Sequence, residues 1–135
     1  MLKAVRIISL VLAVVVLGVI GYYTFGTNVQ LAEIFTTSFK LGHFLAYMAL
    51  GFLIFICYAD FARRRWVGRN ILPMLSAVLI STLVGCAGEL CQPFFGRFFA
   101  LYDMFIDAMG ALTGSLLGLV CVVLMCKIEK RFSKR

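Results

Sequence analysis

Four long apolar stretches constrain this chain more than any other feature of its sequence. They cover residues 7–25, 41–59, 71–88 and 104–126, and none of them contains a Lys or Arg residue. At a rise of about 1.5 Å per residue, roughly 20 residues in a helix cross the hydrocarbon core of a bilayer. Only helices and closed barrels satisfy every backbone group in lipid, and the sequence has no series of alternating strands. We therefore expect an all-α integral membrane protein with four transmembrane helices.

The composition agrees with this expectation. With 63% hydrophobic and 14% charged residues, the chain is unlike an ordinary soluble domain. The 135 residues show no repeat and no low-complexity segment, so we expect one domain over residues 1–135. The first stretch follows Lys3 and Arg6, as a signal peptide would, but the bulky Tyr22 and Tyr23 near its end favour a membrane span anchored at the interface.

The basic residues predict an orientation. All but two of the 13 Lys and Arg residues lie before the first stretch, between the second and third, or after the fourth. The exceptions are Lys40 and Arg97. The positive-inside rule then places both termini and the middle connection in the cytoplasm, with the basic runs against anionic lipid. Because no aromatic residues interleave a basic surface, we expect no binding of nucleic acid.

The five cysteines lack the CxxC spacing of redox or zinc sites, and we expect them to be small packing residues. We predict neither a disulfide nor a structural zinc ion. The cysteines are Cys57, Cys86, Cys91, Cys121 and Cys126.

Polar residues gather at the outer ends of the second, third and fourth predicted helices. Residues three or four apart share a helix face, and ionisable groups at the membrane boundary usually face the bundle interior. We therefore expect an outward-facing polar pocket between these helices. Its candidates are Lys40, His43 and Tyr47 on the second helix, Glu89 and Gln92 on the third, and Asp103 and Asp107 on the fourth.

Below the carboxylates, the fourth helix carries Gly110, Gly114 and Gly118 at intervals of four residues. Glycines at this spacing let a neighbouring helix backbone approach closely. We expect these three glycines to form a helix-packing face.

The segment at residues 93–102, between the third and fourth helices, is too apolar for an aqueous loop and too short to span. We expect an interfacial or partly re-entrant loop, with Pro93 and Gly96 shaping its turns. Arg97 is the one charged residue of this segment and needs an acceptor, for which Glu89, Asp103 and Asp107 are the candidates. For Asp107 we favour an ion pair with Arg97 over a role as a proton carrier. Arg97 thereby joins the candidate pocket.

The polar residues of this pocket allow two interpretations, one functional and one structural. His43 with the nearby carboxylates could exchange protons or hold a metal ion, and it could equally form a hydrogen-bond network that fixes helix packing. With one His and no HxxE or HExxH pattern, we expect no metal and no other cofactor. The serines show no triad signature, so whether the protein is an enzyme stays open, with a preference against it.

The ordered patterns Lys40-x2-His43-x3-Tyr47-x2-Leu50-Gly51, Glu89-x2-Gln92 and Arg97-x5-Asp103-x3-Asp107-x2-Gly110 resemble the VanZ-like family of small bacterial membrane proteins. The resemblance covers residues 40–118. The sequence departs from the family at Gly88 and Cys91, where part of the family has an acid and a His. The resemblance implies a connection with resistance to the glycopeptide antibiotic teicoplanin, which acts outside the cytoplasmic membrane.

Together these expectations describe a multi-pass protein of the bacterial cytoplasmic membrane that binds or modifies a cell-envelope component. Its partners would be membrane lipids and a lipid-linked cell-wall precursor or glycopeptide. One alternative is a non-catalytic assembly protein whose glycine face packs against a partner helix. The other is a small transporter subunit, which would need an oligomer because four helices leave little room for a pathway.

Overall fold

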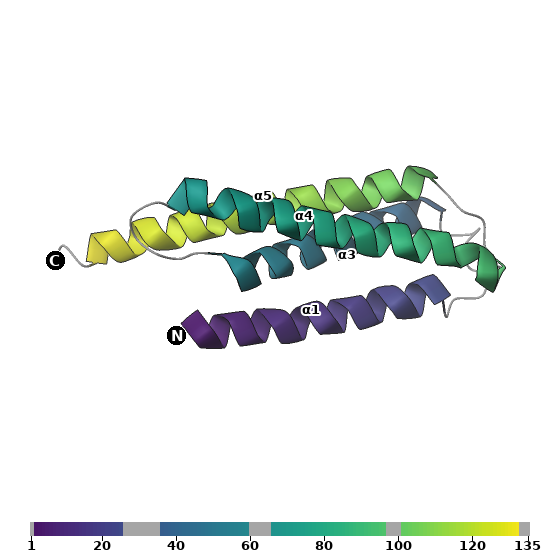
Figure 1. The fold of residues 1–135 in the computed structure, drawn as a ribbon, viewed down its shortest axis with the longest axis horizontal. Helices are drawn as coiled ribbons and strands as arrows, with labels where there is room; N and C mark the ends of the chain where they lie inside the picture. The colour runs from purple at the N-terminus through teal and green to yellow at the C-terminus, as the bar shows by residue number, and fades with distance from the viewer. Residues whose placement is uncertain (1, 26–35, 60–65, 97–100, 133–135) are drawn as a thin grey trace.

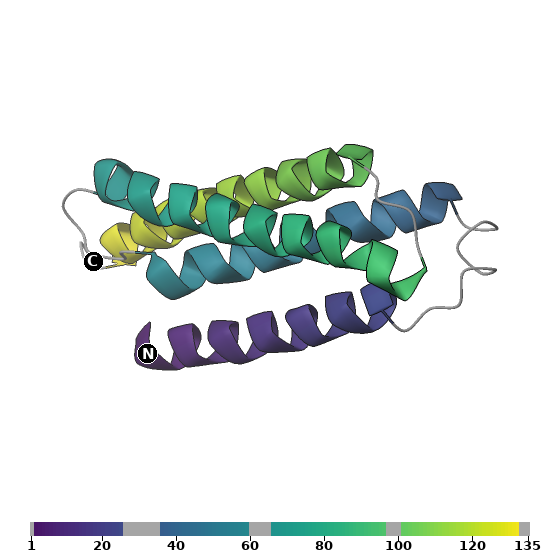
Figure 2. The ribbon, with the colours of Figure 1, turned by 45° about the vertical axis from the view of Figure 1, so that its right-hand side comes forward.

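The computed structural model describes residues 2–25, 36–59, 66–96 and 101–132, and these form a bundle of long helices. Its elements are α1 (Leu2–Phe25), α3 (Thr36–Tyr58), α4 (Trp66–Cys91), the short 3-10 helix η1 (Gln92–Phe95) and α5 (Leu101–Phe132). Four of the helices are long and apolar enough to cross a membrane, which confirms the predicted fold class. The bundle is elongated, and its two termini lie at the same end (Figures 1 and 2).

The helices extend beyond the apolar stretches from which we predicted them. The first begins at Leu2 rather than at residue 7, and the last ends at Phe132 rather than at residue 126. The predicted boundaries followed the charged residues, which leave the hydrocarbon, but a helix can continue into the interface while Lys and Arg extend towards water.

The third helix also continues further than expected. The 3-10 helix η1 follows α4 without a break, and Gly96 forms its C-terminal cap. Gly96 has a left-handed φ of 74°, and its N–H donates to the Pro93 carbonyl at 3.2 Å. Glycine adopts this backbone conformation without a steric penalty. Pro93 to Gly96 are therefore a helical extension and its cap, and residues 97–100 of the expected interfacial loop lie outside the described residues.

Glycines set the distance between α3 and α5, the most closely packed pair of helices. A Cβ atom at Gly110 would lie 2.5 Å from the Phe44 carbonyl oxygen, and one at Gly114 would overlap the Met48 carbonyl oxygen. Without side chains at these positions the two backbones are in direct contact. Further along, a Cβ atom at Gly118 would lie 2.5 Å from the Phe55 ring.

The other two helices cover this pair. The fourth helix, α4, packs chiefly on α5, and α1 packs on α3 (Figure 2). Ser9, Ala13 and Thr24 are the buried residues of α1, and Ala13 joins the apolar cluster around Tyr47 and Leu50. Because contacts tie α1 mainly to one helix, it is the peripheral member of the bundle.

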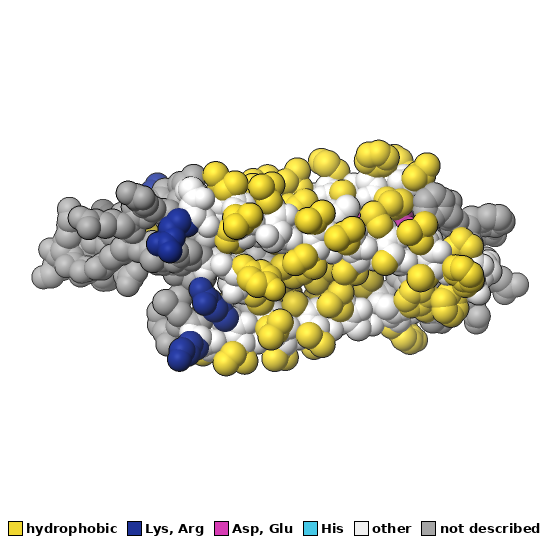
Figure 3. Space-filling model, in the orientation of Figure 1, with side chains coloured by type: hydrophobic (Ala, Val, Ile, Leu, Met, Phe, Trp, Pro, Cys, Tyr) yellow, Lys and Arg dark blue, Asp and Glu magenta, His cyan; other side chains and the backbone are white. Residues whose placement is uncertain are grey.

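The outer surface of the bundle is apolar along its length. Large side chains point outward, with Leu72 71% exposed, and yellow atoms cover the middle of the face in Figure 3. A continuous apolar surface of this kind matches hydrocarbon rather than water. On the same face, Lys and Arg gather at one end and the visible acidic atoms at the other (Figure 3). The chain is therefore built as a multi-pass membrane protein.

Candidate functional site

A partly buried histidine and a buried aspartate meet between α3 and α5. The Nδ1 atom of His43 lies 3.1 Å from Oδ1 of Asp107, whose residue is only 1% exposed. The glycine contact explains this meeting, because Phe44 follows His43 in α3 and Gly110 lies one turn beyond Asp107 in α5. The close backbone approach at Phe44 and Gly110 brings the two polar side chains within reach.

The third helix brings a second carboxylate to the same point. Glu89 is also 1% exposed, and its Oε1 accepts a hydrogen bond from Nε2 of the buried Gln92, one turn along the chain. His43, Glu89 and Asp107 each have a potential ligand atom, and these three atoms lie within 4.8 Å of one another. Three helices therefore converge on one small polar volume.

The Tyr47 ring completes the group. It lies one turn below His43 on α3, with ring centroids 6.2 Å apart and planes at 29°, and it is almost fully buried. The members of this buried polar cluster are His43, Tyr47, Glu89, Gln92 and Asp107. All five were expected in the outward-facing pocket.

A glycine of α4 makes room for the Asp107 carboxylate. A Cβ atom at Gly85 would lie 2.7 Å from Asp107 Oδ2, so this oxygen rests directly against the α4 backbone, one turn before Glu89. The same oxygen is buried and has no hydrogen-bond partner among the described residues. Gly85 was not among the residues expected near the pocket, although it lies four residues before Glu89 and thus on the same helix face.

The remaining predicted pocket residues lie around this cluster or are not among the described residues. Lys40 is exposed, and its Nζ lies 4.9 Å from the centroid of the Tyr102 ring. Asp103 is half-buried one turn before Asp107. Arg97 lies outside the described residues, so the expected ion pair with Asp107 is not described, and the partner that is described for Asp107 is His43.

A small hollow adjoins the cluster on a side that we did not expect. The predicted pocket lay between the second, third and fourth helices, whereas this hollow of about 60 Å³ lies between α1 and α3. Its lining is almost entirely apolar, with His43 and Tyr47 at one wall. The lining residues are Val19, Ile20, Tyr23, Thr24, Gly42, His43, Ala46 and Tyr47. The first helix, for which the sequence offered no motif, thus contributes to the surroundings of the site.

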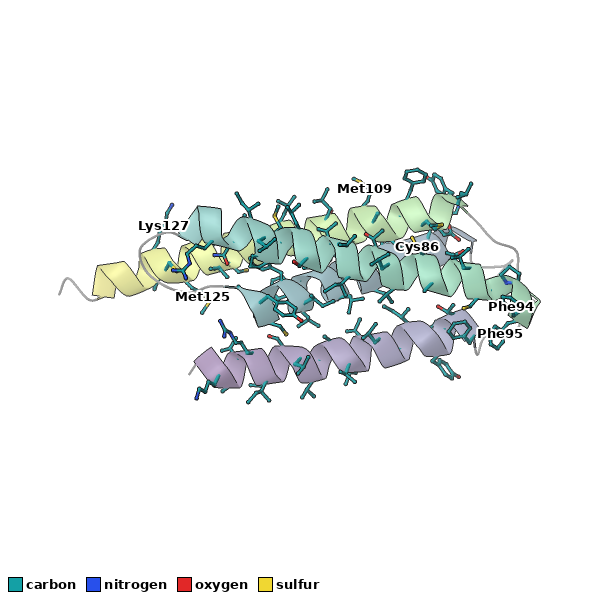
Figure 4. The ribbon with its side chains drawn as sticks, in the orientation of Figure 1. Cys86, Phe94, Phe95, Met109, Met125 and Lys127 are labelled. Carbon is teal, nitrogen blue, oxygen red and sulfur yellow. The ribbon has the colours of Figure 1, made fainter. Side chains whose placement is uncertain are left out.

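The end of the bundle next to the buried polar cluster carries the aromatic side chains of η1. Phe94 and Phe95 lie at the tip of η1, at the opposite end of the bundle from Lys127 (Figure 4). The Phe95 ring packs against Phe25 with centroids 4.9 Å apart, which connects η1 to the end of α1.

A family model described as VanZ/LLP1 matches residues 3–124. The chain belongs to the VanZ/LLP1 family. This confirms the resemblance drawn from residues 40–118 and extends it to the first helix. Comparisons with curated proteins and with solved structures find no match.

The VanZ/LLP1 match includes every member of the buried polar cluster and the glycines that position it. An imidazole next to two carboxylates can exchange protons, accept hydrogen bonds from hydroxyl or amino groups, and bind a cation. The site therefore has chemistry that simple helix packing does not require.

Proposed function

We propose that this VanZ/LLP1 protein binds the polar head group of a cell-envelope lipid or lipid-linked cell-wall precursor at the buried polar cluster. The observation that carries the proposal is the convergence of His43, Glu89 and Asp107 from three membrane-spanning helices. Ionisable groups within spans are unfavourable in lipid, and where they occur they usually serve binding or transport.

The proposed orientation places this cluster near the outer surface of the bacterial cytoplasmic membrane. Lys3 and Arg6 lie near the start of α1 and Lys127 near the end of α5, at the end of the bundle that carries both termini (Figure 1). His43 and Asp107 lie near the starts of α3 and α5 and Glu89 near the end of α4, so the cluster belongs to the other end. Under the positive-inside rule, the basic end is cytoplasmic. A head group of the outer leaflet would then reach the cluster from the side where glycopeptides such as teicoplanin act, and occupancy of that head group would reduce antibiotic access.

A purely structural role is the alternative, and one contact favours it. The contact between His43 and Asp107 joins α3 to α5, as a bond that fixes helix packing would. The assembly alternative is weaker, because α3 of the same chain already covers Gly110 and Gly114, so these glycines are not free to meet a partner helix.

The test is equilibrium binding of the purified chain to nanodiscs that contain phosphatidylglycerol, cardiolipin or an undecaprenyl-linked cell-wall precursor, with teicoplanin as a further ligand. The variants are His43→Gln and Asp107→Asn, which keep the size and hydrogen-bonding capacity of the side chains. We expect selective binding of one lipid class that weakens at least about tenfold in each variant, equivalent to about 1.4 kcal/mol.

The matched control is Thr113→Ala, on the same helix as Asp107. Thr113 Oγ1 donates to the Met109 carbonyl at 2.8 Å, an exposed hydrogen bond within α5. Binding that survives in folded His43→Gln and Asp107→Asn proteins would leave the structural role as the explanation of the cluster.

A further inference from the structure

Three candidate metal ligands converge in the buried polar cluster. The ligand atoms of His43, Glu89 and Asp107 lie within 4.8 Å of one another, and one comes from each of α3, α4 and α5. We propose that these three side chains bind one divalent transition-metal ion. Ion binding is measured without any lipid, so it succeeds or fails independently of the proposed head-group binding.

The separations suit such an ion. In a tetrahedral site, ligand nitrogen and oxygen atoms at roughly 2.0 to 2.2 Å from a metal lie about 3.3 to 3.6 Å from one another. The three atoms lie within 4.8 Å of one another, so side-chain rotations that close these separations by up to about 1.5 Å bring them into coordination range.

The second carboxylate oxygen of Asp107 provides an independent indication. Oδ2 is buried and lacks a hydrogen-bond partner among the described residues, while Oδ1 faces His43. A buried acceptor without a donor is unfavourable, and coordination of a cation satisfies it. Gly85 contributes by leaving space for this carboxylate against the α4 backbone.

The charges also favour a divalent cation. Glu89 and Asp107 are both 1% exposed and lie within membrane-spanning helices. A divalent ion bound between the two carboxylates lowers the unfavourable free energy of burying negative charge there.

The donor set indicates the class of metal. Imidazole nitrogen favours Zn²⁺, Fe²⁺ and related ions, whereas carboxylate oxygen also suits Mn²⁺. Three protein ligands leave a coordination position open, as in sites where the metal contacts a substrate. The suggestion that an anionic head-group oxygen fills this position is the one step that rests on the proposed function.

We expected no metal from the sequence because no single helix carries a pair of ligands at the spacing of a known zinc motif. The structure places the three ligands on different helices, and their convergence depends on the packing at Gly85 and Gly110. Spacing along the chain does not reveal an arrangement of this kind.

The experiment is metal analysis of the purified wild-type chain in detergent after incubation with Zn²⁺ or Mn²⁺ and removal of the excess, followed by calorimetric titration. We expect about one ion per chain and a higher unfolding temperature with the ion present. Asp107→Asn and Glu89→Gln should weaken affinity at least about 100-fold, since loss of a residue that merely supports a ligand already costs roughly 10- to 100-fold.

The matched control is Glu129→Gln, which removes the same charge from the far end of α5. It should bind the ion as tightly as wild type. An ion-free wild-type chain, or affinity retained in folded Asp107→Asn and Glu89→Gln proteins, would overturn the proposal.

X-ray absorption of the Zn²⁺-loaded wild-type chain keeps the test decisive where a variant does not fold. We expect nitrogen and oxygen neighbours at about 2.0 to 2.2 Å, including an imidazole. Sulfur neighbours at about 2.3 Å would assign the ion to cysteines and refute the site.

Discussion

At the scale of single residues, glycines that lack a Cβ atom shape the helix contacts as much as the polar side chains do. Gly110 and Gly114 allow α3 and α5 to touch, and Gly85 gives the Asp107 carboxylate its place. His43 and Asp107 then form the polar contact across the helix interface. Substitutions at the glycines test the helix packing, and substitutions at His43 and Asp107 test the polar contact.

We expect Gly114→Ala to lower the free energy of unfolding by at least about 1–3 kcal/mol, because its Cβ atom would overlap the Met48 carbonyl oxygen. The measurement is reversible unfolding in mixed detergent micelles. Gly18→Ala is the control, since nothing lies within 4 Å of its Cβ position. Equal effects of the two substitutions would show that the close α3–α5 contact does not determine stability.

Gly85→Ala should displace the Asp107 carboxylate, because the new methyl group would lie 2.7 Å from Oδ2. We expect a loss of about 1–3 kcal/mol in stability that is largely relieved when Asp107 is also changed to Ala. Gly88→Ala is the matched control on the same helix, where the nearest atom, Thr24 Cγ2, is 3.8 Å away. Additive effects of Gly85→Ala and Asp107→Ala would contradict the described contact.

The polar contact between His43 and Asp107 is tested by a double-mutant cycle with His43→Ala and Asp107→Ala, which remove the interacting groups. For residues 3.1 Å apart we expect a coupling free energy of about 0.5–3 kcal/mol, measured by unfolding of the four proteins. A coupling of zero would mean that the two side chains do not interact in the folded chain.

At the scale of helices, α1 is held to the bundle by contacts at both of its ends. Arg6 Nη2 donates to the Ala59 carbonyl at 3.0 Å, where α3 has just ended, and Phe25 packs against Phe95 of η1. Between these ends, Ala13 and Ile20 pack against the cluster around Tyr47 and Leu50. The first helix thus closes the side of the bundle next to His43.

Arg6→Ala removes the donor for a carbonyl at the C-terminal end of α3, where backbone acceptors have no partner within the helix. We expect a loss of about 1 kcal/mol in unfolding free energy, because the contact is only partly buried. Lys3→Ala, which removes the same charge from the same helix, should change stability less. If the two substitutions are equally harmful, the loss reflects charge rather than the contact with Ala59.

At the scale of the whole molecule, the apolar surface and the separation of charge along the bundle define how it would lie in a membrane. The basic side chains visible in Figure 3 lie at the end where the chain begins and ends. The bounds of α3, α4 and α5 place the buried polar cluster near the other end. This asymmetry is the basis for placing the cluster at the outer leaflet.

Reporter fusions test this orientation. Alkaline phosphatase fused after residue 135 should be inactive in bacterial cells, and a green fluorescent protein at the same position should fluoresce, because the positive-inside rule keeps that end in the cytoplasm. Phosphatase inserted after residue 30 serves as the opposite control and should be active. The reverse pattern would place the polar cluster on the cytoplasmic side.

The class of fold follows from the amino-acid sequence, because the length and polarity of four stretches leave a helical bundle as the fold that satisfies the backbone in lipid. The sequence also supplied the family, through ordered polar patterns, and the residues of the buried polar cluster. Helix ends were less well predicted, because charge marks the edge of the hydrocarbon rather than the end of the hydrogen bonds.

The packing of the helices in the tertiary structure determines which of these residues meet. The sequence suggested an ion pair between Arg97 and Asp107, which stays a prediction because Arg97 lies outside the described residues. Helix packing at Gly110 brings His43 to the Asp107 carboxylate, and Gly85 brings α4 against it. Periodicity reports which residues share a face of one helix. It does not report how neighbouring helices rotate or slide, and that relation determines whether His43, Glu89 and Asp107 form one site.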